Sequence, residues 1–131
     1  MTDLKNRLEL FETFYHILDQ WLFLKSKGKT ISNFFIDNKY SDIAVYGMGN
    51  MAMHLIDELE SNNIKLKCAI DKEKNSYYTT IPIYSISEQW PAIDVIVVTD
   101  KREMSMLIKR IQEKEIKCDV VTLENVVYWE F

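Results

Sequence analysis

The pattern of apolar and polar residues divides the chain into a helical first part and an alternating second part. Between residues 4 and 24 there is no Gly or Pro, and apolar residues recur three or four positions apart, which predicts one long α-helix. A shorter helix is predicted through Ile31, Phe34 and Phe35. Beyond residue 40, strand-like runs alternate with helical ones, as in α/β proteins. We therefore expect a helical arm over residues 1–40 and a second domain over residues 41–131.

Two apolar stripes run along the predicted long helix, although a surface helix needs only one. The first contains Leu4, Leu8, Phe11, Tyr15, Leu18 and Leu22, and the second contains Leu10, Phe14, Ile17, Trp21 and Leu24. Together they span roughly 200° of the helix surface, about twice the arc that faces one core. If the second stripe is exposed, it forms a larger patch than monomers usually tolerate, so we expect a homodimer through this helix. In the alternative, the short helix and the aromatic tail at residues 128–131 cover one stripe.

The second part begins with an apolar run, residues 43–46, that ends on two glycines and passes directly into a helical pattern. Gly47 and Gly49 belong to the pattern Gly-x-Gly-x-x-Ala. In this pattern the first glycine permits a tight turn, the second lets a phosphate approach the backbone, and Ala52 allows close packing of helix on strand. The unpaired amides that open the helix form an anion site. The turn is therefore a candidate nucleotide-binding turn.

The following strand-like runs determine where such a ligand would lie. Residues 65–70 end in Asp71, at the position where a dinucleotide-binding unit places its ribose-binding carboxylate. Residues 94–99 are apolar on both faces, as a central parallel strand must be. If these two runs flank the strand at residues 43–46, the chain forms a Rossmann-like, doubly wound, mainly parallel sheet of four to five strands. The point where the strand order reverses then lies between Gly47 and Thr99.

Two further segments complete this domain. Residues 81–84 are a short apolar run that Pro82 confines to a sheet edge or a strand start, and Ser85 and Glu88 have the spacing of a capping box before a short helix. Residues 117–123 are the last predicted strand, and the apolar tail beyond them should be docked on the domain.

Three segments should border the crevice at the reversal point, namely residues 47–51, 71–74 and 99–102. Their candidate ligand-binding residues are Gly47, Met48, Gly49, Asn50, Met51, Asp71, Lys72, Thr99, Lys101 and Arg102. Asp71 either simply ends a strand or binds ribose hydroxyls, in which case it repels the 2′-phosphate of NADP. Lys101 and Arg102 oppose the dipole of the helix they open by roughly 0.3–1 kcal/mol each. An anion in the crevice would offset this cost, unless both side chains point into solvent.

Composition and charge narrow the classes of partner. The chain has 131 residues, 47% of them hydrophobic and 27% charged, as in one globular domain. Its net charge of −4 comes from interleaved acids and bases, which favours neither nucleic acid nor an anionic membrane as a partner. No apolar run reaches the roughly 20 residues that span a bilayer, and the start does not resemble a signal peptide. We therefore expect a cytoplasmic protein with a small-molecule or protein partner.

No pattern in the sequence indicates a metal site or a catalytic group. Cys68 and Cys118 are the only cysteines and form no Cys-x-x-Cys motif, and His16 and His54 lie on different predicted helices. No Ser/His/Asp set can be assembled, and no Tyr-x-x-x-Lys pair lies on a predicted helix. We therefore expect no metal and assign no catalytic residue.

From residue 43 onward the chain resembles small Rossmann-like domains of bacterial surface-polysaccharide and nucleotide-sugar proteins. They include the N-terminal domain of sugar acyltransferases and a domain that precedes some nucleotide-sugar dehydratases. The segments that carry the resemblance are Tyr46-Gly47-Met48-Gly49-Asn50-Met51-Ala52, Ala69-Ile70-Asp71, Ile81-Pro82-Ile83-Tyr84, Asp94-Val95-Ile96-Val97-Val98-Thr99 and Leu123-Glu124-Asn125-Val126-Val127-Tyr128. The resemblance implies a pocket for NAD or a nucleotide-sugar in a protein that serves polysaccharide assembly.

Three functional hypotheses follow from the sequence. The first is a non-catalytic module that binds a nucleotide or nucleotide-sugar. The second is a fragment of an NAD-dependent oxidoreductase or epimerase. The third is a protein-interaction domain whose glycine turn has lost its ligand.

Overall fold

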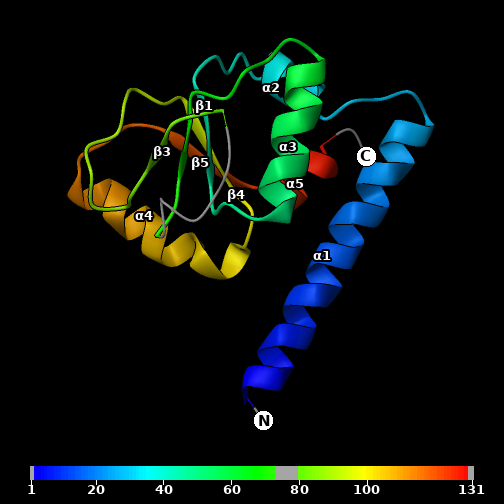
Figure 1. The fold of residues 1–131 in the computed structure, drawn as a ribbon, viewed down its shortest axis with the longest axis horizontal. Helices are drawn as coiled ribbons and strands as arrows, with labels where there is room; N and C mark the ends of the chain where they lie inside the picture. Colours follow the sequence, from blue (N-terminus) through cyan, green and yellow to red (C-terminus); the bar gives the residue numbers. More distant parts are fainter. Residues whose placement is uncertain (1, 73–79, 130–131) are drawn as a thin grey trace.

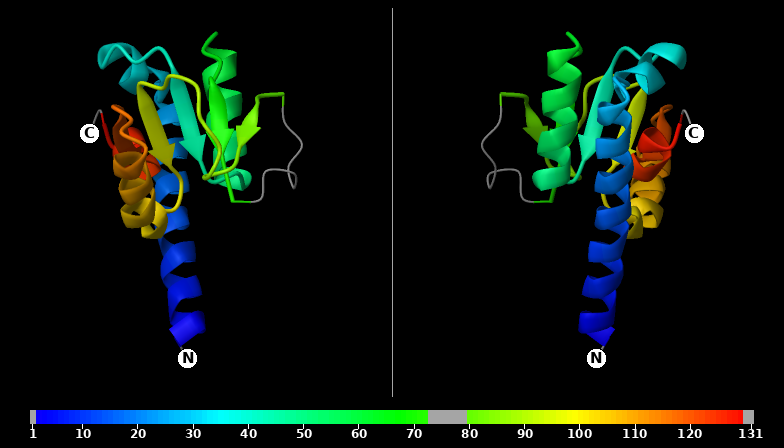
Figure 2. Two further views of the ribbon diagram at one scale, coloured as in Figure 1. Left: turned by 90° about the vertical axis from the view of Figure 1, so that its left-hand side faces the viewer. Right: turned by 90° about the vertical axis from the view of Figure 1, so that its right-hand side faces the viewer.

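A single parallel sheet forms the centre of the protein (Figures 1 and 2), whose computed structural model describes residues 2–72 and 80–129. The strands are β1 (Ile43–Tyr46), β2 (Cys68–Ile70), β3 (Ile83–Tyr84), β4 (Val95–Val98) and β5 (Asp119–Thr122). Their order is β3-β2-β1-β4-β5, and each neighbouring pair is parallel. The expected α/β class is confirmed, as is the position of β1 between β2 and β4.

Helices cover both faces of this sheet, as an all-parallel sheet requires. They are α1 (Thr2–Ser26), α2 (Ser32–Asp37), α3 (Asn50–Ser61), α4 (Met104–Glu113) and α5 (Leu123–Val127), with a 3₁₀ turn, η1 (Lys101–Glu103), before α4. Residues of α1, α2, α3 and α5 share a core with one face of the sheet, while α4 packs on the other. Along β1, Val45 faces the first core and Tyr46 the second, so the strand is buried on both sides.

The segment after β3 differs from its prediction. Ser85 and Glu88 make the expected contact, because the Ser85 amide donates to Glu88 Oε1 at 2.9 Å, but they form a turn and no helix begins there. The indole of Trp90 donates to the Ser85 carbonyl at 3.0 Å. The same carbonyl also accepts a hydrogen bond from the Glu88 amide at 3.2 Å, which closes a single turn.

The two stripes of α1 have different environments. Ile17, Trp21 and Leu24 of the second stripe are buried against the body of the protein, whereas Leu10 and Phe14 are partly buried. Every member of the first stripe, from Leu4 to Leu22, is exposed. The stripe expected at a dimer contact is thus the one that packs on the sheet domain. The N-terminal half of α1 extends beyond that domain (Figure 2).

The first part of the C-terminal tail is docked, as predicted, whereas Tyr128 and Trp129 are exposed and residues 130–131 lie outside the described residues. Val126 and Val127 of α5 are buried, and Gln20 of α1 donates a hydrogen bond to the Val127 carbonyl at 3.2 Å. The second half of α1 and α5 therefore pack on each other beside the sheet.

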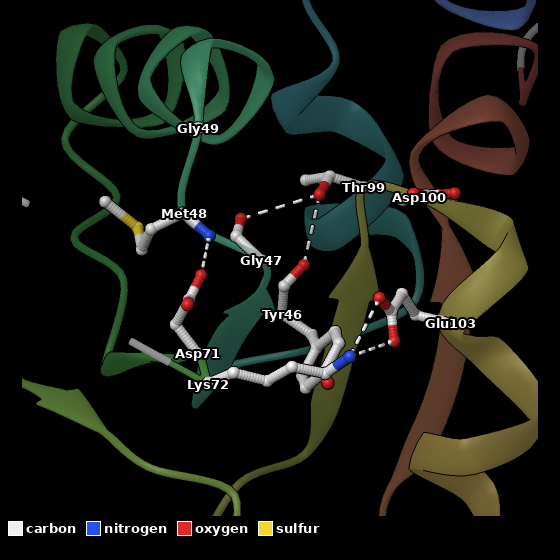
Figure 3. Close-up of a pocket in the computed structure, with 9 residues that line it drawn as sticks. All are labelled: Tyr46, Gly47, Met48, Gly49, Asp71, Lys72, Thr99, Asp100 and Glu103. Carbon is white, nitrogen blue, oxygen red and sulfur yellow. Dashed lines mark hydrogen bonds and ion pairs between the residues drawn. The ribbon is translucent and has the colours of Figure 1, made fainter. Parts of the chain in front are cut away.

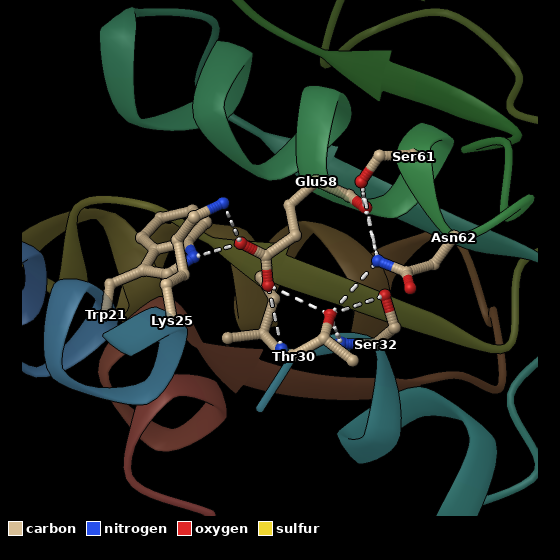
Figure 4. A network of polar contacts seen from close by, with 8 residues as sticks. Trp21, Lys25, Thr30, Ser32, Glu58, Ser61 and Asn62 are labelled. Carbon is tan, nitrogen blue, oxygen red and sulfur yellow. Dashed lines mark hydrogen bonds and ion pairs between the residues drawn. The ribbon is translucent and has the colours of Figure 1, made fainter. Parts of the chain in front are cut away.

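A buried carboxylate fastens α1 to α3 (Figure 4). Glu58, only 7% exposed, accepts hydrogen bonds from Trp21 Nε1 at 2.8 Å, Lys25 Nζ at 3.2 Å, Thr30 Oγ1 at 3.0 Å and the Ile31 amide at 2.9 Å. Burial disfavours the charged carboxylate, but these hydrogen bonds outweigh it and lower the pKa of Glu58. The ionised side chain thus joins α1, α3 and the segment between α1 and α2.

Replacing Glu58 by Gln should lower the free energy of unfolding by about 2 kcal/mol, because hydrogen bonds to charged groups contribute about 1.5–3 kcal/mol. A carboxyl group with a lowered pKa stabilises the fold above its ordinary value, here 4.5, and this contribution is lost as the pH falls through the folded-state pKa. The difference between the wild type and the variant should therefore vanish in acid. Urea unfolding at several pH values measures it. Glu60→Gln, the same substitution at an exposed position of α3, is the control, and an equal loss in both variants would contradict the prediction.

Candidate functional site

The candidate site is a cavity at the carboxyl ends of the central strands (Figure 3). It has a volume of ≈ 240 Å³ and is lined by Tyr46, Gly47, Met48, Gly49, Asp71, Lys72, Thr99, Asp100 and Glu103. It lies where the strand order reverses, since β1 connects through α3 to β2 on one side and pairs with β4 on the other. In open α/β sheets, such a reversal leaves a crevice outside the carboxyl ends of the strands.

Most of the predicted site residues meet at this cavity. Of the candidates, Gly47, Met48, Gly49, Asp71, Lys72 and Thr99 line it, whereas Asn50, Met51, Lys101 and Arg102 do not. Residues 73 and 74, which were expected on the same border, lie outside the described residues. The structure therefore brings predicted residues from all three expected segments to one cavity.

The two glycines of the turn have different roles. Gly47 has φ +91°, and a Cβ atom built on it would lie 2.8 Å from Thr99 Oγ1. The Thr99 hydroxyl itself bonds the Tyr46 carbonyl at 3.2 Å, so the turn is braced from β4. Gly49 is extended, with φ −151°, and a Cβ atom there would meet no atom within 4 Å. Gly47 is thus needed to form the turn, while Gly49 leaves space open beside it.

The N-terminus of α3 opens on this space. Gly49 is its N-cap, its first turn contains no acidic residue, and among the described residues no side chain caps it. Met51 turns its side chain into the core, and the side chain of Asn50 is exposed. The first amides of α3 therefore have no intrahelical acceptor and carry the positive end of the helix dipole.

Asp71 joins β2 to the glycine turn. It is 8% exposed, and its Oδ2 accepts a hydrogen bond from the Met48 amide at 2.6 Å. The Met48 amide therefore binds a carboxylate of the protein itself. Asp71 lies at the predicted place, and it also holds the turn in position.

An ion pair and a buried hydroxyl lie on the other side of the cavity. Lys72 Nζ lies 3.2 Å from the Glu103 carboxylate, and the ring of Tyr46 extends toward this pair (Figure 3). Tyr46 is 3% exposed, and its hydroxyl has no hydrogen-bond partner among the described residues. Burial, together with the charges of Glu103 and Asp71, raises the pKa of Tyr46 to about 12. The hydroxyl is therefore a neutral donor at physiological pH.

The charge of the lining is more negative than the sequence suggested. Asp71, Asp100 and Glu103 face one lysine, Lys72. Arg102 does not line the cavity; its guanidinium binds Asp100 at 2.8 Å. Burial disfavours ionised Asp100, but the Arg102 hydrogen bonds outweigh it and lower the pKa of that carboxyl group. Arg102, near the start of the helix, thus has an acidic partner within the protein itself.

Lys101 also has an acidic partner. Its ammonium lies 3.9 Å from the Glu124 carboxylate of α5, and its side chain is largely exposed. The cost of placing Lys101 and Arg102 in the first turn is thus offset by carboxylates of the protein, without an anion in the cavity.

Three residues that line the cavity were not among the site residues predicted from the sequence, namely Tyr46, Asp100 and Glu103. Tyr46 is the last residue of β1, where a side chain on the α4 face reaches the strand end, and strand alternation could have indicated it. Asp100 and Glu103 have the spacing of a helix cap, and Asp100 does accept a hydrogen bond from the Arg102 amide. Both residues also border the cavity. The spacing of a helix cap does not indicate this, because it depends on the direction in which η1 continues from β4.

Comparison with known proteins gives no relative for this site, because no protein-family model, curated protein or solved structure matches the chain. Within residues 2–72 and 80–129, no three His, Cys, Asp or Glu side chains are grouped so that they could hold a metal ion. In the same residues, no helix combines the length and the apolar character needed to cross a membrane. The geometry of the cavity is therefore the basis for inferring a function.

The different roles of the glycines can be tested by making the same change at each. Gly47→Ser should lower the free energy of unfolding by at least about 1–2 kcal/mol, the cost of a left-handed conformation for an L-residue, with the Thr99 contact in addition. Gly49→Ser should leave it unchanged or raise it slightly, because Ser is a favoured N-cap residue. Denaturant unfolding of both variants measures the difference. Equal losses would show that the turn does not depend on Gly47.

Proposed function

We propose that this chain is a non-catalytic module that binds a nucleotide or nucleotide-sugar on a Rossmann-like domain. The observation that carries the proposal is the glycine turn, which directs the uncapped N-terminus of α3 into a cavity where the strand order reverses. Helix N-termini at such points favour phosphate groups. The resemblance of residues 43–131 to domains of bacterial polysaccharide-biosynthesis proteins suggests the setting, a cytoplasmic step of surface-polysaccharide assembly.

The lining supports a ligand that combines phosphates with hydroxyl groups. A diphosphate would lie over Gly49 and the first amides of α3, and Lys72 is the one cation among the residues that line the cavity. Asp71, Asp100 and Glu103 would face ribose or sugar hydroxyls, which carboxylates accept as hydrogen-bond donors. A ligand without hydroxyl groups would leave three carboxylates beside its phosphates, which is unfavourable.

Two titratable groups that line the cavity have a shifted pKa, and both shifts lead away from neutrality. The Tyr46 hydroxyl stays protonated until well above physiological pH, and the Asp100 carboxyl stays ionised, so neither is poised to exchange a proton near neutrality. This favours a binding module over a fragment of an NAD-dependent oxidoreductase or epimerase. The third hypothesis is a protein-interaction domain that has lost its ligand. The binding experiment below distinguishes it from the other two, because such a domain would bind no nucleotide.

Thermal unfolding with NAD, NADH, NADP, UDP-sugars, CoA and S-adenosylmethionine should identify the ligand class. A ligand at 100 times its dissociation constant stabilises the fold by about 2.7 kcal/mol. Gly49→Val should abolish the shift, because its branched side chain fills the open space beside the α3 amides. The variant should stay folded, since the backbone at Gly49 is extended, with a loss of about 1 kcal/mol for a poor N-cap.

The control for this prediction is Lys65→Val, on the exposed segment before β2, which should keep the full shift. Calorimetry on the folded Gly49→Val protein then measures the affinity directly. Unchanged affinity would place the ligand elsewhere, and no shift with any nucleotide would refute the proposal.

A dinucleotide preference should follow from the charge of Asp71. The wild type should bind NAD at least about tenfold more tightly than NADP, because a carboxylate beside the ribose repels a 2′-phosphate. Asp71→Asn should narrow this gap, since Asn removes the charge but keeps an oxygen that can accept from the Met48 amide. Competition between the two cofactors measures both values. Tighter binding of NADP by the wild type would remove Asp71 from the ribose role.

A further inference from the structure

The first stripe of α1 remains uncovered by the described residues. Its six side chains are between 36% and 66% exposed, and they are Leu4, Leu8, Phe11, Tyr15, Leu18 and Leu22. We call this set the outer seam. Isolated apolar residues are normal on a surface, but six in a row along one helix form a contiguous patch of the kind that marks an interaction site.

The spacing of the outer seam fits another helix. Its positions are separated by four, three, four, three and four residues, the a and d positions of a heptad repeat. This period of 3.5 residues keeps one stripe facing a partner helix as the two wind around each other. Tyr15 at an a position and Phe11 at a d position give the seam bulky central knobs.

We propose that the outer seam packs antiparallel against the outer seam of a second copy of this chain. The spacing is the same in both directions, so the seam matches its own reverse. Leu4 would then pair with the partner's Leu22, Leu8 with the partner's Leu18, and Phe11 with the partner's Tyr15. Such a contact is isologous, because each pair occurs twice around a two-fold axis.

The shape of the protomer favours the antiparallel direction. Residues 3–9 of α1 are exposed on all sides, and this half of the helix projects past the sheet domain (Figure 2). Beside the other half lies a groove of ≈ 480 Å³ between α1 and α3, lined by Leu18, Trp21, Leu22, Lys25, His54, Asp57, Glu58 and Ser61. An antiparallel partner lays its projecting half along this groove. A parallel partner would leave the groove open.

Charges at the two ends of the outer seam are complementary in this direction. The projecting half carries two exposed cations beside the seam, Lys5 and Arg7, and the other half carries Asp19, with Asp57 of α3 across the groove. In the antiparallel register the heptad positions place Lys5 opposite the partner's Asp19 on both sides of the two-fold axis, and Arg7 toward the partner's groove and its Asp57. At the axis itself the same register places the exposed Glu12 opposite the partner's Glu12. Opposite charges that flank a seam determine orientation more than affinity.

The area is sufficient for a stable pair. Large apolar side chains that are about half exposed offer roughly 100 Å² each, so the two seams would bury roughly 1,300 Å² with their flanks. Specific interfaces bury about 1,200–2,000 Å² in total. The contact thus lies at the lower end of the normal range, and the groove adds to it.

Light scattering on the intact chain should give the mass of a dimer at micromolar concentration. Leu8→Glu should weaken the dimer at least about 100-fold, because the two-fold axis introduces two buried charges, while circular dichroism shows an unchanged fold. Asn6→Glu, an equal change on the same exposed turn but off the seam, should remain dimeric. A wild type that is monomeric at high micromolar concentration, or a Leu8→Glu protein that stays dimeric, would overturn the proposal.

Cross-linking tests the direction. A mixture of Leu8→Cys and Leu18→Cys chains should form a disulfide between the two variants under mild oxidation, and neither variant alone should do so efficiently. Self-linking of the Leu8→Cys chain would show a parallel seam and overturn the antiparallel assignment. The wild type, with Cys68 buried and Cys118 half-buried, is the control for linkage through native cysteines. None of these measurements depends on a bound nucleotide.

Discussion

The burial of β1 is the constraint on which the rest of the structure depends. An all-parallel sheet must be covered on both faces, and here the central strands expose almost nothing. One face is covered by α4 and by the segment that contains Trp90 and Ile93. The other face is covered by α3, α5, α2 and the second half of α1. The N-terminal helix is therefore a part of the core for half its length, and only its first half is an arm.

The same constraint creates the cavity. Because β2 and β4 lie on opposite sides of β1, the connections that leave their carboxyl ends diverge, and the glycine turn lies between them. The protein closes this gap with its own polar groups: Asp71 binds the Met48 amide, Thr99 binds the Tyr46 carbonyl, and Lys72 binds Glu103. What remains open is the space beside Gly49 and the start of α3. The Tyr46 hydroxyl, which has no hydrogen-bond partner within residues 2–72 and 80–129, is a cost of this arrangement, since a buried unsatisfied polar group costs about 1–3 kcal/mol.

Patterns in the sequence were enough to predict the elements that repeat a strong local signal. Three patterns are each typical of one kind of structure: the apolar run of β4, the glycine turn and the one-sided apolar pattern of α3. The parallel order of the strands around β1 then follows from the right-handed crossover connections. The site was predictable where it lies on strand ends, as at Asp71 and Thr99. The site was not predictable where it depends on which side chains form ion pairs. From the sequence alone, Arg102 could equally bind Asp100 or a ligand. The negative lining comes from such pairings.

The stripe of α1 that faces inward could not be predicted either, because both stripes have similar length and apolar character. The deciding residue is Glu58, which is distant in sequence from α1. Trp21 belongs to the second stripe, and its indole donates to the Glu58 carboxylate. If α1 rotated to bury the outer seam instead, Trp21 would turn away and leave a buried carboxylate short of partners, a loss of several kcal/mol. A polar contact therefore selects the apolar face that packs on the sheet, and by the same choice it leaves the heptad-spaced face on the surface.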